Sequence, residues 1–173
     1  QAGNELKLFA SPWAPPPWMT NTGKVIHNPK LQNTEVMKKT YVNYLMKFFE
    51  EYEKEGLTFW GMTAQNEPNG NIGYWQSMVF TPEEQRDFIR DHLGPALKGK
   101  YTSIKLMMHD DQRYNLPHWP DVVLKDPLAA QYIDGIAIHW YESLDDIVTW
   151  MWRPFHRIQQ TGEKYPNKFM YAS

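Results

Sequence analysis

Strand-like apolar segments alternate with helix-like segments along this chain, and the alternation limits the fold more than any other feature of the sequence. A strand, a helix and a second strand in succession form a right-handed unit whose strands are parallel. The sequence therefore predicts an α/β fold with one parallel sheet that is covered on both faces. We expect the strands near residues 6–10, 57–63, 104–108, 135–139 and 168–172.

Signals for helix boundaries agree with this order. Apolar and aromatic residues recur at three- and four-residue spacing between Thr34 and Gly56, which predicts one amphipathic helix with Thr34 as its N-cap. The segment Thr81-Pro82-Glu83-Glu84 has the residues of a capping box, so the next helix should begin directly after Thr81. We expect a short helix over Trp119–Lys125 and a longer one from about residue 145 to residue 160.

Length and composition exclude several classes of protein. The chain has 173 residues, enough for one ordinary domain but short of the ~250 residues of a closed eight-stranded barrel. A net charge of −2, with both signs interspersed, argues against a nucleic-acid partner. The absence of cysteine excludes thiol catalysis, and no apolar run approaches the ~18 residues of a membrane span. Aromatic residues make up 15% of the chain, which favours a cleft where flat rings stack on sugars.

Polar side chains follow three of the predicted strands at the point where each strand ends. They are Asn66-Glu67, then Asp110-Asp111 with Gln112-Arg113, then His139-Trp140-Tyr141. Parallel strands present their carboxyl ends at one edge, which is where a β/α barrel keeps its chemistry. We therefore expect Glu67 to be a proton donor to a glycosidic oxygen and Asn66 to bind the neighbouring sugar hydroxyl. A retaining glycosidase needs a second carboxylate ~5–5.5 Å away, which must come from another strand.

Several of these residues also have ordinary structural interpretations. Asp110 and Asp111 are as well suited to capping the next helix or pairing with Arg113. His139 has no second histidine at metal-ligand spacing, so no metal site is expected. No serine stands in a nucleophile-elbow context. Tyr74 and Trp75 lie in a glycine-containing loop after Glu67, where aromatic rings are more often placed to touch substrate, whereas Trp150 and Trp152 fall in a helical stretch and favour packing.

The assembled motifs resemble glycoside hydrolase family 30, and within it the glucosylceramidases. The resemblance implies a (β/α)8 TIM barrel, of which this chain would supply about strands three to seven, with Glu67 as acid/base and Asn66 as 2-hydroxyl partner. It implies that Trp13 contacts sugar and that His139 and Tyr141 line the glucose pocket. With Tyr74 and Asp111, these are the expected substrate-binding residues. The motifs are Ala10–Trp13, Thr63–Pro68, Phe80–Ile89, Asp110–Arg113, Leu116–Trp119 and Ile138–Tyr141.

Departures from the family pattern bear on activity. The family's nucleophile is a glutamate directly after a Phe-Ala-Ser-like strand end, and here Tyr171-Ala172-Ser173 are the last residues. We therefore expect residues 1–173 to be an incomplete catalytic domain that lacks the nucleophile, the first two strands, the last strand and the flanking β domain. Gln65 replaces the family's usual glutamate before Asn66-Glu67, a change expected to tolerate function because the catalytic position is Glu67.

Three functions follow as hypotheses. The resemblance implies a retaining β-glucosidase that acts on glucosylceramide without a cofactor, in the lysosome or secreted, with a lipid-presenting activator protein and peripheral membrane contact as candidate partners of the full-length protein. The first alternative is a family relative that acts on another β-glycoside, such as a xylan or a glucan. The second is a non-catalytic remnant that binds sugar or lipid, since half of a catalytic pair cannot turn over.

Overall fold

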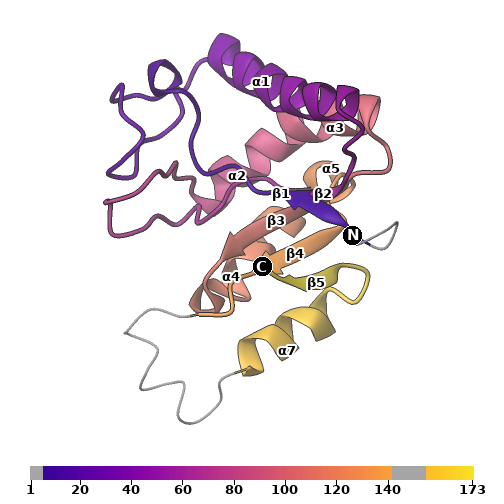
Figure 1. Ribbon diagram of the computed structural model, residues 1–173. Helices are drawn as coiled ribbons and strands as arrows, with labels where there is room; N and C mark the ends of the chain where they lie inside the picture. The colour runs from indigo at the N-terminus through magenta and orange to yellow at the C-terminus, as the bar shows by residue number, and fades with distance from the viewer. Residues whose placement is uncertain (1–5, 142–154) are drawn as a thin grey trace.

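The centre of the molecule is one sheet of five parallel strands, arranged in the order in which they occur along the chain (Figure 1). The computed structural model describes residues 6–141 and 155–173. The predictions of an α/β fold and of five parallel strands are confirmed. The strands are β1 (Leu8–Ala10), β2 (Phe59–Thr63), β3 (Lys105–Asp111), β4 (Gly135–Ile138) and β5 (Phe169–Ala172).

The first two helices begin where the sequence predicts them. The Thr34 hydroxyl accepts a hydrogen bond from the Met37 amide at the start of α1 (Glu35–Lys54). The Thr81 hydroxyl accepts from the Glu84 amide while the Glu84 carboxylate accepts from the Thr81 amide, which completes the capping box of α2 (Pro82–Phe88). A π-helical turn, η3 (Ile89–Leu93), joins α2 to α3 (Gly94–Lys100).

The remaining helices are shorter. The expected helix near Trp119 is α4 (His118–Leu124), and Asp126 caps a further turn, α5 (Pro127–Ala130). For the helix expected at about 145–160, residues 145–154 lie outside the described residues, and the structure has α7 (His156–Lys164) over the remainder. Two 3₁₀ turns, η2 (Pro17–Met19) and η4 (Arg113–Asn115), lie in loops. Within the described ranges, no helix is long and apolar enough to cross a bilayer.

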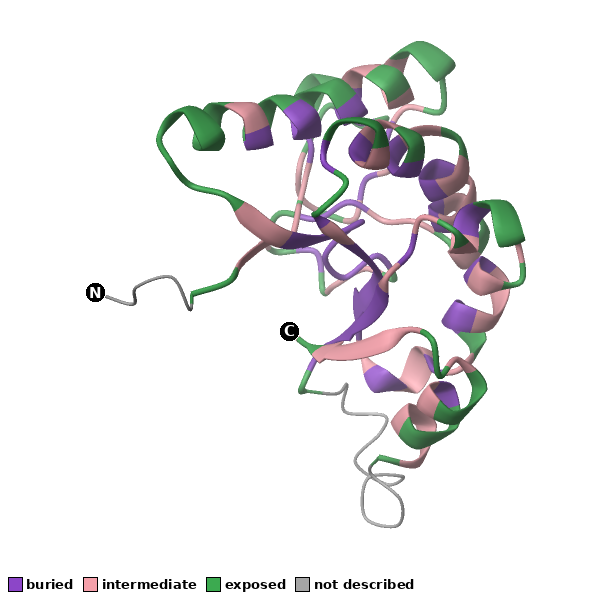
Figure 2. Ribbon diagram, turned by 90° about the vertical axis from the view of Figure 1, so that its right-hand side faces the viewer, coloured by how far each residue is buried: buried purple, intermediate pink, exposed green. Residues whose placement is uncertain are grey.

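The core lies between the sheet and the helices α1 to α5, and burial is deepest in the middle of the sheet. All four residues of β4 are buried, whereas those of β1 and most of β5 are half-buried (Figure 2). The buried face of α1 packs on β2, where Phe49 and Phe59 have ring centroids 5.3 Å apart. The other face of α1 carries lysine–glutamate ion pairs in contact with solvent. The buried residues of α1 are Tyr41, Val42, Leu45, Met46 and Phe49.

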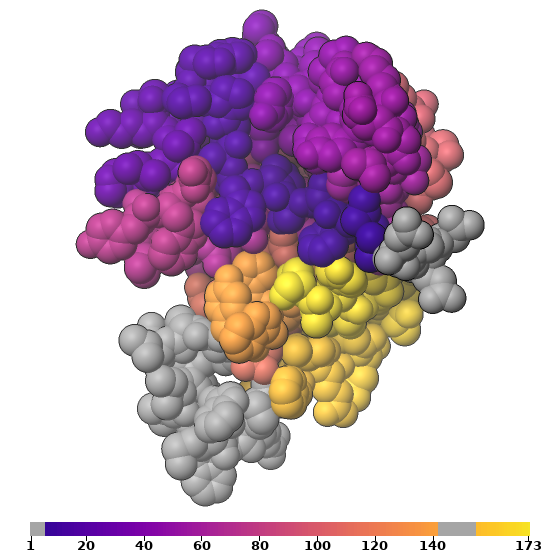
Figure 3. All heavy atoms as spheres, in the orientation of Figure 1, coloured from indigo at the N-terminus to yellow at the C-terminus, as the bar shows by residue number. Residues whose placement is uncertain are grey.

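The sheet is curled, because its two outer strands approach each other on one face. Phe9 of β1 and Tyr171 of β5 have ring centroids 5.0 Å apart, although three strands separate β1 from β5 in the sheet order. Trp60 of β2 contacts both Tyr171 and Phe169, at 5.8 Å and 5.6 Å. Figure 3 shows the indigo segment that follows residue 5 directly against the yellow carboxyl-terminal segment on the surface of the molecule. Such curvature is what an arc of a barrel requires.

Strand β3 is longer than predicted and carries polar residues inside the sheet. It continues past Met108 to Asp111, and its pairing with β4 shifts register between His109 and Asp111. His109 and Asp110 have φ values of 70° and 62°, in the left-handed region that non-glycine residues avoid at a cost of order 1–3 kcal/mol. The irregularity re-aims the side chains that follow, a common use of bulges near functional sites.

An apolar groove of about 440 Å³ runs along β1 and α1. Tyr44 and Tyr52 line it with 49% and 41% of their surface exposed. In the described structure β1 pairs with β2 alone and β5 with β4 alone, so strand edges are open as well. Exposed edges and apolar patches favour association. We expect the 173-residue chain to self-associate, and the Tyr44→Lys/Tyr52→Lys variant to shift sedimentation profiles toward monomer.

The control is Val36→Lys, a substitution at an exposed apolar residue of α1 that does not line the groove. It should leave the sedimentation profile unchanged. A monodisperse wild-type monomer with a sharp cooperative melt would contradict the prediction.

Candidate functional site

The predicted polar residues do come together at the carboxyl edge of the sheet. Glu67 follows β2, Asp110 and Asp111 end β3, and His139 follows β4. All four are buried, with Glu67 and His139 each only 6% exposed. The structure therefore gathers three carboxylates and one imidazole at a single edge.

Glu67 is held in place through both its backbone and its carboxylate. Its amide donates to the Asp110 carbonyl at 2.9 Å, and its φ of 44° turns the chain sharply after β2. The Tyr141 hydroxyl donates to Oε1 at 2.6 Å, and the Trp75 indole N–H lies 3.4 Å from Oε2. Two aromatic donors from different loops thus orient the carboxylate.

His139 lies between two carboxylates. Its Nε2 is 3.4 Å from Asp110 Oδ1, and its Nδ1 is 3.7 Å from Glu67 Oε1. Burial by itself lowers the pKa of His139, but the hydrogen bond to Asp110 and the charges of Asp110, Asp111 and Glu67 outweigh burial and raise the pKa above its usual value. The imidazole is therefore favoured as a cation at mildly acidic pH.

The Asp111 carboxylate is hydrogen-bonded to the loop that follows Glu67. Its Oδ2 accepts from the Asn69 amide at 2.8 Å and its Oδ1 accepts from the Gln112 amide at 2.7 Å. Burial is the largest influence on its pKa and raises it to about 6, against the opposing effect of those two hydrogen bonds. Asp111 therefore ties β3 to the turn after Glu67, and its expected contact with substrate remains a prediction.

The loops after β1 and β2 lie side by side, which brings Trp13 near Asn66. The Asn66 amide donates to the Pro12 carbonyl at 2.9 Å, and Gln65 Nε2 donates to the Trp13 carbonyl at 2.8 Å. Asn66 is 8% exposed, whereas Trp13 is 47% exposed. The Gln65 side chain thus connects the loop after β2 to the loop after β1. The sugar-binding roles of Trp13 and Asn66 remain predictions.

Two aromatic neighbours in the loop after Glu67 point differently from each other. Tyr74 is 80% exposed, while the Trp75 indole faces the Glu67 carboxylate. Position in a βα loop predicts substrate contact for both rings but does not say which way each ring points. Tyr74 remains a predicted substrate contact, and Trp75 is the ring that the structure places against the carboxylate.

Sequence reasoning missed the hydroxyl groups that surround Asp110. Ser11 and Thr63 both donate to Asp110 Oδ2, at 2.6 Å and 2.7 Å, and Ser173 donates to Oδ1 at 2.7 Å. These residues are 47 to 99 positions from Asp110, so spacing along the chain carries no sign of the cluster. The one available signal is that each hydroxyl stands at the carboxyl end of a predicted strand.

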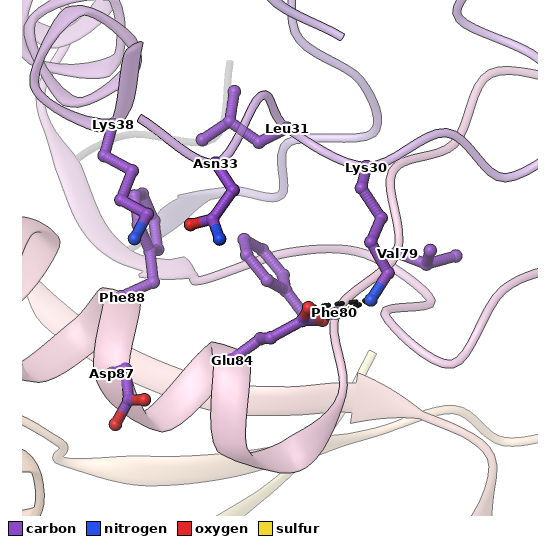
Figure 4. Close-up of a pocket in the computed structure, with 9 residues that line it drawn as sticks. All are labelled: Lys30, Leu31, Asn33, Lys38, Val79, Phe80, Glu84, Asp87 and Phe88. Carbon is purple, nitrogen blue, oxygen red and sulfur yellow. Dashed lines mark hydrogen bonds and ion pairs between the residues drawn. The ribbon is translucent and has the colours of Figure 1, made fainter. Parts of the chain in front are cut away.

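A separate pocket of about 320 Å³ lies between α1, α2 and the loop before α1 (Figure 4). In this pocket Lys30 Nζ is 2.7 Å from Glu84 Oε1, so the positive charge of Lys30 and the negative charge of Glu84 neutralise each other. None of the predicted site residues lines it. In residues 6–141 and 155–173, no group of three His, Asp or Glu side chains is placed to hold a metal ion. The pocket is lined by Lys30, Leu31, Asn33, Lys38, Val79, Phe80, Glu84, Asp87 and Phe88.

The raised pKa values of Asp111 and His139 predict how stability depends on pH. The folded state binds protons that the unfolded chain releases, so stability should fall as pH rises through the folded pKa values. For Asp111, the rise from 3.8 to about 6 corresponds to at most about 3 kcal/mol between pH 4 and 7. We expect urea unfolding to show the contribution of Asp111 as a difference between two proteins: from pH 4 to pH 6 the wild type should lose more stability, or gain less, than Asp111→Asn.

The matched control is Asp134→Asn, at the amino end of β4. The pKa of Asp134 is lowered, since hydrogen bonds from Lys98 and Leu106 outweigh its partial burial. The variant should therefore keep the wild-type slope between pH 4 and 6, even if it is less stable throughout. Equal slopes for the wild type and Asp111→Asn, or a steeper decline in Asp111→Asn, would contradict the prediction.

Comparison with known proteins agrees with this geometry. Residues 1–173 match the family model of the glycosyl hydrolase family 30 TIM-barrel domain. The chain is 43% identical over 173 residues to the lysosomal acid glucosylceramidase of Mus musculus, with 97% of this chain and 32% of that protein covered. It is 28% identical over 164 residues to the endo-1,6-β-D-glucanase of Neurospora crassa, with 92% and 32% covered.

Solved structures show the same architecture. An endo-β1,6-glucanase structure superposes with a TM-score of 0.82 at 27% identity, over 99% of this chain and 37% of that one. The chain spans about a third of the length of the curated relatives above. Its curled parallel sheet is consistent with part of a TIM barrel.

Proposed function

The chain belongs to glycosyl hydrolase family 30, and we propose that residues 1–173 are part of a retaining β-glucosidase that acts on glucosylceramide. The identity to the mouse glucosylceramidase supports this choice of substrate. The observation that carries the chemistry is the buried Glu67 carboxylate, held between Tyr141, Trp75 and His139 at the carboxyl edge of the sheet. On this proposal, residues 1–173 form an incomplete catalytic domain, equivalent to about strands three to seven of the barrel.

Glu67 serves as the acid/base in this proposal. In the first step its carboxyl group protonates the glycosidic oxygen while a nucleophilic carboxylate attacks the anomeric carbon and the aglycone leaves. In the second step Glu67 takes a proton from water, which attacks the anomeric carbon and releases the nucleophile. The nucleophile is a glutamate expected directly after the β5 strand end, at a position that would follow Ser173. Asn66, Trp13 and His139 bind the sugar.

The favoured alternative is hydrolysis of another β-glycoside. Two of the similar proteins above are endo-1,6-glucanases, and they too cover nearly the whole chain. Glu67 would be the acid/base for either substrate, so the residues that contact the aglycone decide between the two. Parallel assays on glucosylceramide and on a β-1,6-glucan would separate the two. A non-catalytic binding role for the chain alone is the remaining alternative.

Compartment and partners follow from the same resemblance. The mouse relative is named as a lysosomal acid enzyme, and we propose a lysosomal or secreted location for the protein that contains this chain. A cationic His139 beside Glu67 suits an acidic compartment. A lipid substrate also makes a lipid-presenting activator protein and peripheral membrane contact part of the proposal.

The chain alone should not turn over substrate. Double displacement needs one group to protonate the leaving oxygen and another to form the glycosyl intermediate, and Glu67 supplies only the first. We expect no β-glucosidase activity from the 173-residue chain with fluorogenic glucosides. A chimera in which residues 1–173 replace the matched segment of the mouse relative should be active. Turnover by the chain alone would mean that the catalytic pair is assigned wrongly.

Replacing Glu67 in that chimera tests its role. Glu67→Gln should lower kcat on glucosylceramide by about 10²–10⁴-fold, because the leaving alkoxide is no longer protonated. Aryl glucosides with acidic leaving groups need less proton donation and should lose much less. Azide should restore deglycosylation, since a small anion can replace the water that Glu67 activates. Steady-state kinetics over a series of leaving groups measures the difference.

The control is Glu53→Gln, at an exposed glutamate of α1, which should behave as wild type. If Glu67→Gln lost activity equally on every leaving group and azide had no effect, Glu67 would be a structural residue.

A further inference from the structure

We propose that Asp110 is a positioning residue that holds Glu67, through His139 and its own backbone, in register with the carboxyl end of β5. The inference rests on the proposed role of Glu67 as acid/base. It concerns a residue whose ordinary interpretation from sequence is a helix cap or a partner of Arg113.

The Asp110 carboxylate connects the ends of all five strands. Asp110 lies on β3 and is 1% exposed. It accepts hydrogen bonds from Ser11 after β1, Thr63 at the end of β2 and Ser173 after β5. His139, after β4, faces Oδ1 at 3.4 Å. A carboxylate has about four acceptor positions, and here four groups from four other strand ends occupy them.

Asp110 reaches Glu67 by two routes. Its main-chain carbonyl accepts from the Glu67 amide at 2.9 Å, which holds the turn after β2. Its carboxylate holds His139, whose Nδ1 points to Glu67 Oε1 at 3.7 Å and has no hydrogen-bond partner of its own among the described residues. An imidazolium with carboxylates at both ring nitrogens resists rotation, because turning it would separate both pairs of charges.

The hydrogen bond from Ser173 connects Asp110 to the carboxyl end of β5. Ser173 donates its hydroxyl to Asp110 and its amide to the Ile138 carbonyl at 3.0 Å. The proposed nucleophile would follow this residue directly. One buried carboxylate therefore sets the separation between Glu67 and the place where the nucleophile is expected, a separation that decides between retention and inversion.

If Asp110 positions His139, its negative charge must act on the imidazole, whereas a residue that only packs would act through its shape. The titratable groups that act on His139 are Asp110, Asp111, Glu67 and the neighbouring His109, and the Tyr141 ring lies 5.0 Å away. An opposite charge this close typically raises a histidine pKa by about 1 to 3 pH units. Asp110→Asn keeps the shape of the side chain but removes the charge, so the His139 pKa should fall by about 1 pH unit or more.

The measurement is an NMR titration of isotope-labelled histidines in the 173-residue chain, kept dilute. The chain has six histidines, and a His139→Gln variant assigns the resonance. The control is Asp134→Asn, which removes a carboxylate with several hydrogen bonds at the opposite edge of the sheet. It should leave the His139 pKa unchanged. Equal His139 pKa values in wild type and Asp110→Asn would overturn the proposal.

A second variant gives a change of opposite sign and does not depend on Asp110→Asn folding. Ser11→Ala/Thr63→Val removes both donors from Oδ2 and keeps the carboxylate. With these two hydrogen bonds gone, the negative charge of Asp110 is less delocalised onto other partners. It should therefore stabilise protonated His139 more strongly, and the His139 pKa should rise. A fall, or no change, would mean that this pKa reports general loosening of the site, and the positioning role would be wrong.

Kinetics in the chimera test the consequence for catalysis. Asp110→Asn should lower kcat by roughly 10- to 100-fold with a smaller change in KM, because misplacement of the acid/base affects the transition state more than binding. Asp134→Asn should keep kcat near wild type. An unchanged kcat for Asp110→Asn in an active chimera would also overturn the proposal. An inactive wild-type chimera would count against the proposed function, while the titration still decides the role of Asp110.

Discussion

Parallel pairing of all five strands brings their carboxyl ends to one edge of the sheet, and the geometry of the site follows from this constraint. An antiparallel neighbour would have sent Glu67 or His139 to the opposite edge. The pairing also depends on the helices, because each returns the chain to the amino edge before the next strand starts. Caps at Thr34 and Thr81 set where two of these returns begin.

At that edge the backbone departs from ordinary conformations. Glu67, His109 and Asp110 all have positive φ, and the pairing of β3 with β4 shifts by one residue between His109 and Asp111. Each departure is unfavourable locally, yet the carboxylates of Glu67 and Asp110 end on either side of the His139 ring. Proteins commonly break local rules at functional sites and compensate elsewhere. Here the compensation is hydrogen bonding from three hydroxyls to Asp110 and from Tyr141 to Glu67.

Much of the candidate site could be predicted from the sequence because its residues stand beside strand ends. Glu67 and His139 are each recognisable as polar residues after an apolar run, and parallel topology then makes them neighbours. The choice of Trp75 over Tyr74 as the ring against Glu67, and the hydrogen bond from Ser11 to Asp110, could not be predicted in this way. Both depend on which direction a loop residue points and on contacts between residues far apart in the chain, and neither leaves a periodic pattern.

The sequence by itself determined the order of strands and helices, the caps and the set of polar residues available at one edge, because these depend on local periodicity and on chain chirality. Only the tertiary structure decided that Asp111 supports the loop after Glu67, that Asp110 is shared among the five strand ends, and that Trp75 rather than Tyr74 faces the Glu67 carboxylate. The physical reason is that hydrogen bonds and ion pairs act over about 3–4 Å in space. Distance along the chain does not report that separation.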